Sequence, residues 1–170
     1  MDKKLRRQYG PACAGLFLVA LAGPVSAWSD RQQLPDPSVL DRGRYLVMVT
    51  GCNDCHTSGY MVAEGKIPEA QWLTGDSFGW RGPWGTTYAK NLRLTASKLS
   101  EDEWVAFTRN LRARPPMPWF NLNVMEEGDL QAIYHFIRSL GPAGEAAPEF
   151  LPPDQEPQPP FAVFPSAEAE

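Results

Sequence analysis

Two cysteines and a histidine lie within five consecutive residues, Cys52-Asn53-Asp54-Cys55-His56. This spacing is typical of covalent haem attachment, in which both thiols add to the vinyl groups of haem and the histidine binds the iron. The pattern arises by chance in roughly one ordinary chain in a thousand. It therefore predicts one haem c, attached through Cys52 and Cys55, with His56 as an iron ligand.

The remaining cysteine and histidine argue against other uses of the two thiols. They are Cys13, near the N-terminus, and His135, far along the chain. A structural zinc site needs two further ligands close to the pair. A thioredoxin-like thiol pair follows a strand in a βαβ unit, and no such alternation of strand and helix patterns is present. Haem attachment is therefore the favoured interpretation.

The N-terminus has the three parts of an export signal. Residues 1–10 carry four basic side chains, residues 11–25 are mostly apolar, and Val25-Ser26-Ala27 supplies the small residues before a cleavage site. We expect a signal peptide over residues 1–27, cleaved near Ala27, and a periplasmic protein. The alternative is an uncleaved anchor that contacts the membrane, although the apolar stretch is shorter than the about 20 residues of a comfortable span.

Length and charge limit the organisation and the partners of the exported chain. We expect a short extension over residues 28–35, one domain over residues 36–141 and a Pro-rich acidic tail over residues 142–170. The whole chain has a formal net charge of −4, and removal of the basic leader makes it more acidic. Nucleic acid is therefore a poor partner. A partner with a positive rim, or an apolar contact, is the natural expectation.

Three helix patterns separated by long Gly/Pro-rich connections predict an all-α fold, since no run of alternating strand residues is evident. The first helix has Asp36 as its N-cap and Pro37 at its first position, and leads to Gly51 and the cysteines. The second begins at a capping box, Ser100-Glu101-Asp102-Glu103, and is stopped by Pro115 and Pro116.

The third helix is expected over residues 126–140, with Asn123 and Glu126 in capping positions and Gly141 at its end. At 100° per residue its apolar side chains share one face, and His135 projects nearly opposite. We therefore interpret His135 as a surface residue and not as an iron ligand. The apolar face consists of Leu130, Ile133, Tyr134, Ile137 and Leu140.

A methionine is the usual soft second ligand of a haem iron that transfers electrons. Met48 and Met61 lie too close along the chain to His56 to reach around the ring. Met117 lies between two prolines in a loop, which can cross the opposite haem face without regular hydrogen bonding. Met125, at a helix entrance, is the competitor. Met117 is favoured as the ligand, and ordinary core filling is its alternative role.

These features resemble those of class I c-type cytochromes over residues 36–140. Segments that resemble dehydrogenase-associated periplasmic members are Gly82-Pro83-Trp84-Gly85, Tyr88-Ala89-Lys90-Asn91-Leu92 and Pro116-Met117-Pro118-Trp119. The resemblance implies a cytochrome c-like fold with three main helices around one haem. It also implies that the first and last helices cross near a glycine and aromatic residues, for which Gly43 and Tyr45, with Tyr134 or Phe136, are the matching positions.

The resemblance further implies that polar loop side chains hold the haem propionates. The alternative is a Gly/aromatic loop that packs on itself. The candidate propionate ligands are Trp80, Arg81, Trp84, Tyr88 and Asn91.

The tail from residue 142 onward is expected to be a disordered or extended linker, because it is rich in proline and acidic residues. Its apolar residues could pin it to the domain or to a partner. They are Phe150, Leu151, Phe161, Val163 and Phe164.

The expected function is electron transfer in a respiratory chain and not catalysis, with iron held by His56 and Met117. The protein would accept electrons from a periplasmic dehydrogenase and pass them to a respiratory cytochrome or oxidase. Two alternatives stay open. One is a haem enzyme or gas-binding sensor with an open sixth position, and the other is a permanent cytochrome subunit of a larger oxidoreductase.

Overall fold

The computed structural model describes residues 35–165 of the chain. The predicted signal peptide, its cleavage site near Ala27 and Cys13 lie outside the described residues. Within residues 35–165, no helix combines the length and the apolar character needed to cross a membrane.

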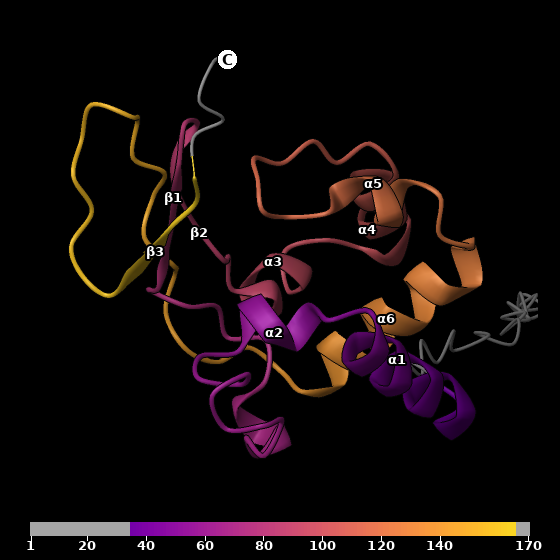
Figure 1. Ribbon diagram of the computed structural model, residues 1–170. Helices are drawn as coiled ribbons and strands as arrows, with labels where there is room; N and C mark the ends of the chain where they lie inside the picture. Colours follow the sequence, from indigo (N-terminus) through magenta and orange to yellow (C-terminus); the bar gives the residue numbers. More distant parts are fainter. Residues whose placement is uncertain (1–34, 166–170) are drawn as a thin grey trace, which may run out of the picture. The chain divides into compact units, whose positions relative to one another are not determined.

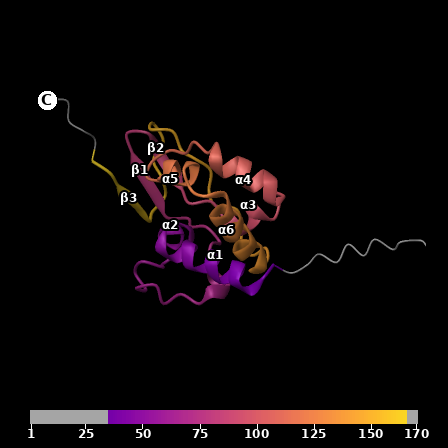
Figure 2. The same cartoon turned by 90° about the vertical axis from the view of Figure 1, so that its right-hand side faces the viewer.

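The described chain contains both helices and a β-sheet, so the expectation of an all-α fold is wrong (Figure 1). The helices gather on one side of the domain, and the sheet with the C-terminal segment lies on the other (Figures 1 and 2). The elements are α1 (Pro37–Val49), α2 (Cys52–His56), a 3₁₀ turn η1 (Glu69–Gln71), β1 (Gly79–Gly82), β2 (Gly85–Tyr88), α3 (Leu92–Ala96), α4 (Glu101–Arg109), α5 (Trp119–Asn123), α6 (Glu127–Ser139) and β3 (Phe161–Val163).

Helix α1 begins where the sequence predicts. The Asp36 carboxylate accepts a hydrogen bond from the Ser38 backbone N–H at 2.8 Å, and Pro37 occupies the first position. The first-turn N–H groups have no partner inside the helix, so this cap supplies one. The helix ends at Val49, and Gly51 adopts a left-handed φ of 74° that turns the chain into α2.

Helix α4 has the predicted capping box but ends earlier than expected. The Ser100 hydroxyl accepts from the Glu103 backbone N–H, and the Glu103 carboxylate accepts from the Ser100 N–H at 2.8 Å. The helix stops at Arg109, before the prolines. The prediction that Pro115 and Pro116 end it is therefore wrong. The last turn is instead bound by side chains: Asn110 Nδ2 donates to the Ala106 carbonyl and Asn123 Nδ2 of α5 to the Thr108 carbonyl, both at 2.8 Å.

Helix α6 buries the predicted apolar face except Leu140, which is partly buried, and it buries Phe136 as well. Gly141 follows it with a left-handed φ of 70°. His135 lies on the other side, where its Nε2 is 2.9 Å from a Glu101 carboxylate oxygen of α4. The placement of His135 away from the core face is therefore as predicted, although an acidic partner covers part of it.

Helices α1 and α6 cross in close contact at Gly43, as the resemblance implies, with Phe136 opposite; Tyr45, the other expected residue on α1, is instead 54% exposed. A Cβ at this position would overlap the Ala132 carbonyl and would lie 2.7 Å from the Phe136 Cβ. Only a glycine therefore permits this approach. Trp72, Leu73 and Trp104 add to the core around the crossing.

The sheet has the order β2-β1-β3. Strands β1 and β2 form an antiparallel hairpin closed by Pro83 and Trp84, with Gly82 paired to Gly85. Strand β3 joins β1 in parallel, with Trp80 opposite Ala162. The hairpin escaped prediction because its strands have only four residues each and are rich in glycine, a composition typical of loops.

Residues 142–165 form an extended segment, here called the strap, that runs along the domain instead of leaving it. Thr86 and Leu151 exchange two backbone hydrogen bonds, of 2.8 and 3.0 Å. The Arg81 guanidinium donates to the Gln155 carbonyl at 2.7 Å and lies 3.1 Å from the Glu156 carboxylate. The strap thereby becomes part of the wall around the site described next.

Candidate functional site

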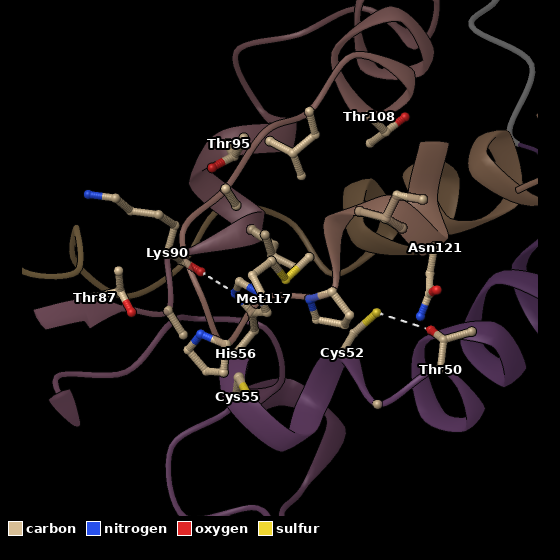
Figure 3. A pocket seen from close by; sticks show the side chains of 18 of the residues that line it. Thr50, Cys52, Cys55, His56, Thr87, Lys90, Thr95, Thr108, Met117 and Asn121 are labelled. Atoms are coloured by element: carbon tan, nitrogen blue, oxygen red, sulfur yellow. Dashed lines mark hydrogen bonds between the residues drawn. The ribbon is translucent and has the colours of Figure 1, made fainter. Parts of the chain in front are cut away.

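A largely apolar cavity of about 750 Å³ lies between the helices and the sheet. Its volume falls within the roughly 300–1,000 Å³ typical of cofactor and small-molecule sites. The two thiols, His56 and Met117 all line it, as Figure 3 shows. The structure therefore brings together four sulfur and nitrogen groups that lie up to 65 positions apart in the chain.

The short helix α2 presents both thiols and the imidazole to the cavity. It starts directly after Gly51, so Cys52 is its first residue and His56 its last. The Thr50 hydroxyl donates to the Leu46 carbonyl at 2.8 Å and lies 3.3 Å from the Cys52 sulfur. A hydroxyl has a single hydrogen, so the Cys52 thiol must be the donor of this second contact.

Both thiols are held in their protonated form. Burial raises the pKa of Cys52, and the nearby Asp54 carboxylate raises it further, against the opposing effect of Thr50. Burial also raises the pKa of Cys55, and the charges of Asp54 and Asp76 act in the same direction. At neutral pH these are thiols and not thiolates, which makes them poor metal or disulfide-exchange groups.

His56 is a neutral imidazole with one nitrogen free for a ligand. Burial lowers its pKa, and a hydrogen bond to the Lys90 backbone carbonyl opposes that shift. The Nδ1 atom lies 2.7 Å from this carbonyl oxygen, which can only accept, so Nδ1 carries the hydrogen. The lone pair is therefore on Nε2, the arrangement that a metal-binding imidazole requires.

The backbone around His56 is fixed by a second set of contacts. The Gly75 N–H donates to the His56 carbonyl at 2.8 Å. The next residue, Thr57, donates from its hydroxyl to the buried Asn53 amide oxygen at 2.7 Å and accepts from the Leu73 N–H at 2.8 Å. Asn53, a variable position of the motif, thus ties α2 to the loop that contains Gly75.

Two methionines, Met117 and Met125, line the cavity. Met48 and Met61 do not, and their side chains are 41% and 55% exposed. The sequence ranked Met117 above Met125 as the iron ligand, and the structure keeps both within the site. The choice between them stays a prediction, which substitution can test.

The structure divides the predicted propionate ligands into two groups. Trp80 and Tyr88 line the cavity. Arg81 is instead occupied by the strap, and the Trp84 indole packs against Phe164, its N–H without a partner among residues 35–165. Asn91 is 3% exposed, and its amide bonds the strap backbone. These last three residues lie outside the cavity lining.

Several residues of the site had no sequence signal or only a weak one. Pro148 and Phe150 of the strap form part of the wall, and the Arg114 guanidinium lies 3.7 Å from the Phe150 ring centroid. The position of Arg114, directly before Pro115-Pro116-Met117, is a signal that could have found it. No sequence signal could have identified the Lys90 carbonyl, because every residue type has a backbone carbonyl.

Charge around the cavity is opposite to that of the chain. Lys90 and Arg114 line it, and its lining within residues 35–165 includes no aspartate or glutamate. The Lys90 ammonium is paired with Glu149, which leaves Arg114 as the cationic side chain of the lining that has no carboxylate partner among residues 35–165. An apolar wall, a guanidinium, two thiols, a neutral imidazole and a thioether fit a haem. No family model, curated protein or solved structure matches this chain.

Proposed function

We propose that this protein is a periplasmic electron carrier of the class I c-type cytochrome kind, with one haem attached through Cys52 and Cys55. The observation that carries the proposal is the shared cavity, where both thiols, the free Nε2 side of His56 and the Met117 thioether meet. A haem held there supplies a one-electron Fe(III)/Fe(II) couple. His56 and Met117 are the proposed iron ligands.

The protonated thiols suit covalent attachment. Cys52 and Cys55 would hold the haem through two thioether bonds, each thiol supplying its sulfur to one carbon and its hydrogen to the other carbon of a vinyl group, with no oxidant or reductant needed. Formation of the Cys52 thioether removes the hydrogen that this thiol shares with Thr50.

The remaining lining residues support binding and exclude water. Apolar walls lower the local dielectric, which affects the reduction potential together with the axial ligands. Arg114 supplies positive charge for a propionate, whereas the Lys90 ammonium is paired with Glu149 at 3.1 Å; Trp80 and Tyr88 can contribute an indole N–H and a phenol O–H.

The proposed location and the proposed electron-transfer partners are supported by the sequence alone. The leader over residues 1–27 supports a periplasmic location, and a dehydrogenase as electron donor with a respiratory cytochrome or oxidase as acceptor completes the proposal. Co-purification from the native periplasm with a dehydrogenase would identify the donor. Stable association would assign the chain as a permanent subunit instead of a free carrier.

The attachment is tested by producing the full chain together with a c-type haem maturation system. We expect one haem per chain that stays bound in denaturant and shifts the protein mass by the mass of one haem. Cys52→Ser with Cys55→Ser should abolish this covalent binding. A wild-type chain that carries no covalent haem under these conditions contradicts the proposal.

The second iron ligand is tested by replacing each cavity methionine. Met117→Ala should remove the methionine-to-iron absorption band and lower the reduction potential, because a thioether favours Fe(II). Met125→Ala should keep the band, and Met61→Ala is a control for an exposed methionine outside the cavity.

A band that persists in Met117→Ala and disappears in Met125→Ala would assign Met125 as the ligand. Carbon monoxide provides the check on coordination. Rapid stoichiometric binding by the reduced wild-type protein at neutral pH would favour an open site, and hence the haem enzyme or gas sensor.

A further inference from the structure

The strap binds the chain segment that carries the Lys90 carbonyl. Thr86, four residues before Lys90, exchanges two backbone hydrogen bonds with Leu151. Asn91, the residue after Lys90, donates from its side-chain amide to the Ala143 carbonyl at 2.8 Å and the Glu145 carbonyl at 3.1 Å. The strap therefore holds this segment on both sides of Lys90.

The Asn91 side chain has no donor hydrogen left for a carboxylate ligand. Its Oδ1 accepts from the Leu94 N–H at 3.0 Å, which caps α3, and both hydrogens of its amide go to strap carbonyls. Because Asn91 is 3% exposed, each of these groups would be costly to leave without a partner. Asn91 is thus fixed between the start of α3 and the strap.

The two residues directly before the strap are themselves anchored. The Arg93 guanidinium donates to the carbonyls of Leu140 and Gly141 at the end of α6, and to the Ala70 carbonyl at 2.8 Å. Arg93 belongs to α3, the helix that Asn91 caps. The strap and the Lys90 segment therefore share one rigid support.

We infer that the strap is a positioning element for His56: through Asn91 it holds the Lys90 carbonyl against the imidazole Nδ1–H. The contact series runs from the Ala143 and Glu145 carbonyls to Asn91, then along the backbone to Lys90, and to His56 at 2.7 Å. Asn91 is a positioning residue, since it lies outside the cavity lining. As a statement about an iron ligand, this inference rests on the proposed function.

The contact has a predicted effect on the ligand. A hydrogen bond that accepts the Nδ1 proton raises the basicity of Nε2 and fixes the ring orientation. A more basic imidazole stabilises Fe(III), so loosening the Lys90 carbonyl should raise the reduction potential. It should also let the Nδ1 proton exchange faster with solvent.

Asn91→Ser separates the two roles of Asn91. Serine is as good an N-cap as asparagine, so the cap of α3 remains, but its side chain has no amide to reach the strap. With two hydrogen bonds lost, we expect Nδ1 proton exchange in the reduced haem protein, measured by NMR, to be roughly tenfold faster. The potential should shift upward, and covalent haem should be retained.

Two further variants define the contact. Glu149→Gln removes the exposed ion pair with Lys90, whose atoms are 3.1 Å apart, and should leave Nδ1 exchange unchanged. A chain that ends at Gly141 lacks the strap and should exchange as fast as Asn91→Ser, with no further effect when both changes are combined. A chain that ends at Pro165 keeps the strap and is its control.

Unchanged exchange and potential in Asn91→Ser, with haem still attached, would overturn the inference and leave the proposed function intact. If the chain ending at Gly141 does not fold, the Nδ1 proton exchange and the reduction potential of Asn91→Ser alone test whether the strap positions His56. If the wild-type protein binds no covalent haem, the proposed function fails. The same exchange comparison on the haem-free protein then decides whether the strap holds the Lys90 carbonyl on His56.

Discussion

At the residue scale, His56 depends on backbone groups more than on other side chains. The Lys90 carbonyl accepts from its ring, and the Gly75 N–H donates to its own carbonyl. Gly75 has a left-handed φ of 82°, and a Cβ there would lie 2.8 Å from the Asn91 nitrogen and 2.9 Å from the Ala89 oxygen. A glycine is required for both the backbone angle and the close approach.

We therefore expect Gly75→Ala to destabilise the protein by about 2 kcal/mol or more, the sum of a left-handed alanine and a displaced neighbour. Gly59→Ala is the matched control, because Gly59 has a φ of 72° but no atom within 4 Å of the added Cβ. It should destabilise the protein only through the left-handed backbone angle, by about 1 kcal/mol. Equal losses in urea unfolding would show that the approach to Asn91 and Ala89 contributes nothing.

At the element scale, the domain depends on the crossing of α1 and α6. The two helices approach until the Gly43 Cα faces the Ala132 carbonyl and the Phe136 side chain. Arg42 of α1 and Asp129 of α6 add a two-pronged ion pair, with both nitrogen to oxygen distances 2.9 Å. This pair is partly exposed, so packing at Gly43 should contribute more than the charges.

Gly43→Ala should destabilise the fold by about 1–3 kcal/mol, since the added methyl group pushes the helices apart. Gly128→Ala, near the start of α6, should instead stabilise it by about 0.5–1 kcal/mol, because its Cβ meets nothing and alanine favours helix. Thermal or urea unfolding of the two variants measures both effects. A Gly43→Ala protein as stable as the wild type would contradict the close packing.

At the scale of the whole molecule, the cavity is enclosed by parts of the chain that are remote in sequence. Helix α2, the loop with Met117, helix α6 and the strap residue Phe150 all contribute to its wall. An apolar space of this size lacks the dispersion contacts of a packed core. The folded state should therefore depend on what fills it.

Under the proposed function, Cys52→Ala with Cys55→Ala prevents haem attachment and should lower the free energy of unfolding by several kcal/mol, a large part of the about 5–15 kcal/mol of an ordinary domain. It should also increase binding of a hydrophobic dye. His135→Gln, which changes a histidine remote from the cavity, is the control and should retain haem and stability. Equal unfolding curves for the double variant and the haem-loaded wild type would contradict a structural role for the group.

Local patterns predicted much of the helical framework. The cap at Asp36 and the capping box at Ser100 act within a few residues, so α1 and α4 begin where expected, although α4 ends early; Gly141 follows α6 as predicted. The sheet was missed, because its hairpin strands are short and rich in glycine. Its third strand, β3, comes from the strap, about 80 residues further along the chain than β1.

The sequence by itself determined the reactive groups: the spacing of Cys52, Cys55 and His56 is a property of five consecutive residues, and Met117 is marked by its flanking prolines. Only the tertiary structure decided which groups surround them. Lys90 acts through a backbone carbonyl and Phe150 through the course of the strap, and neither leaves a pattern in the order of residues. Such contacts arise from the packing of distant segments, so they become visible only when the chain has folded.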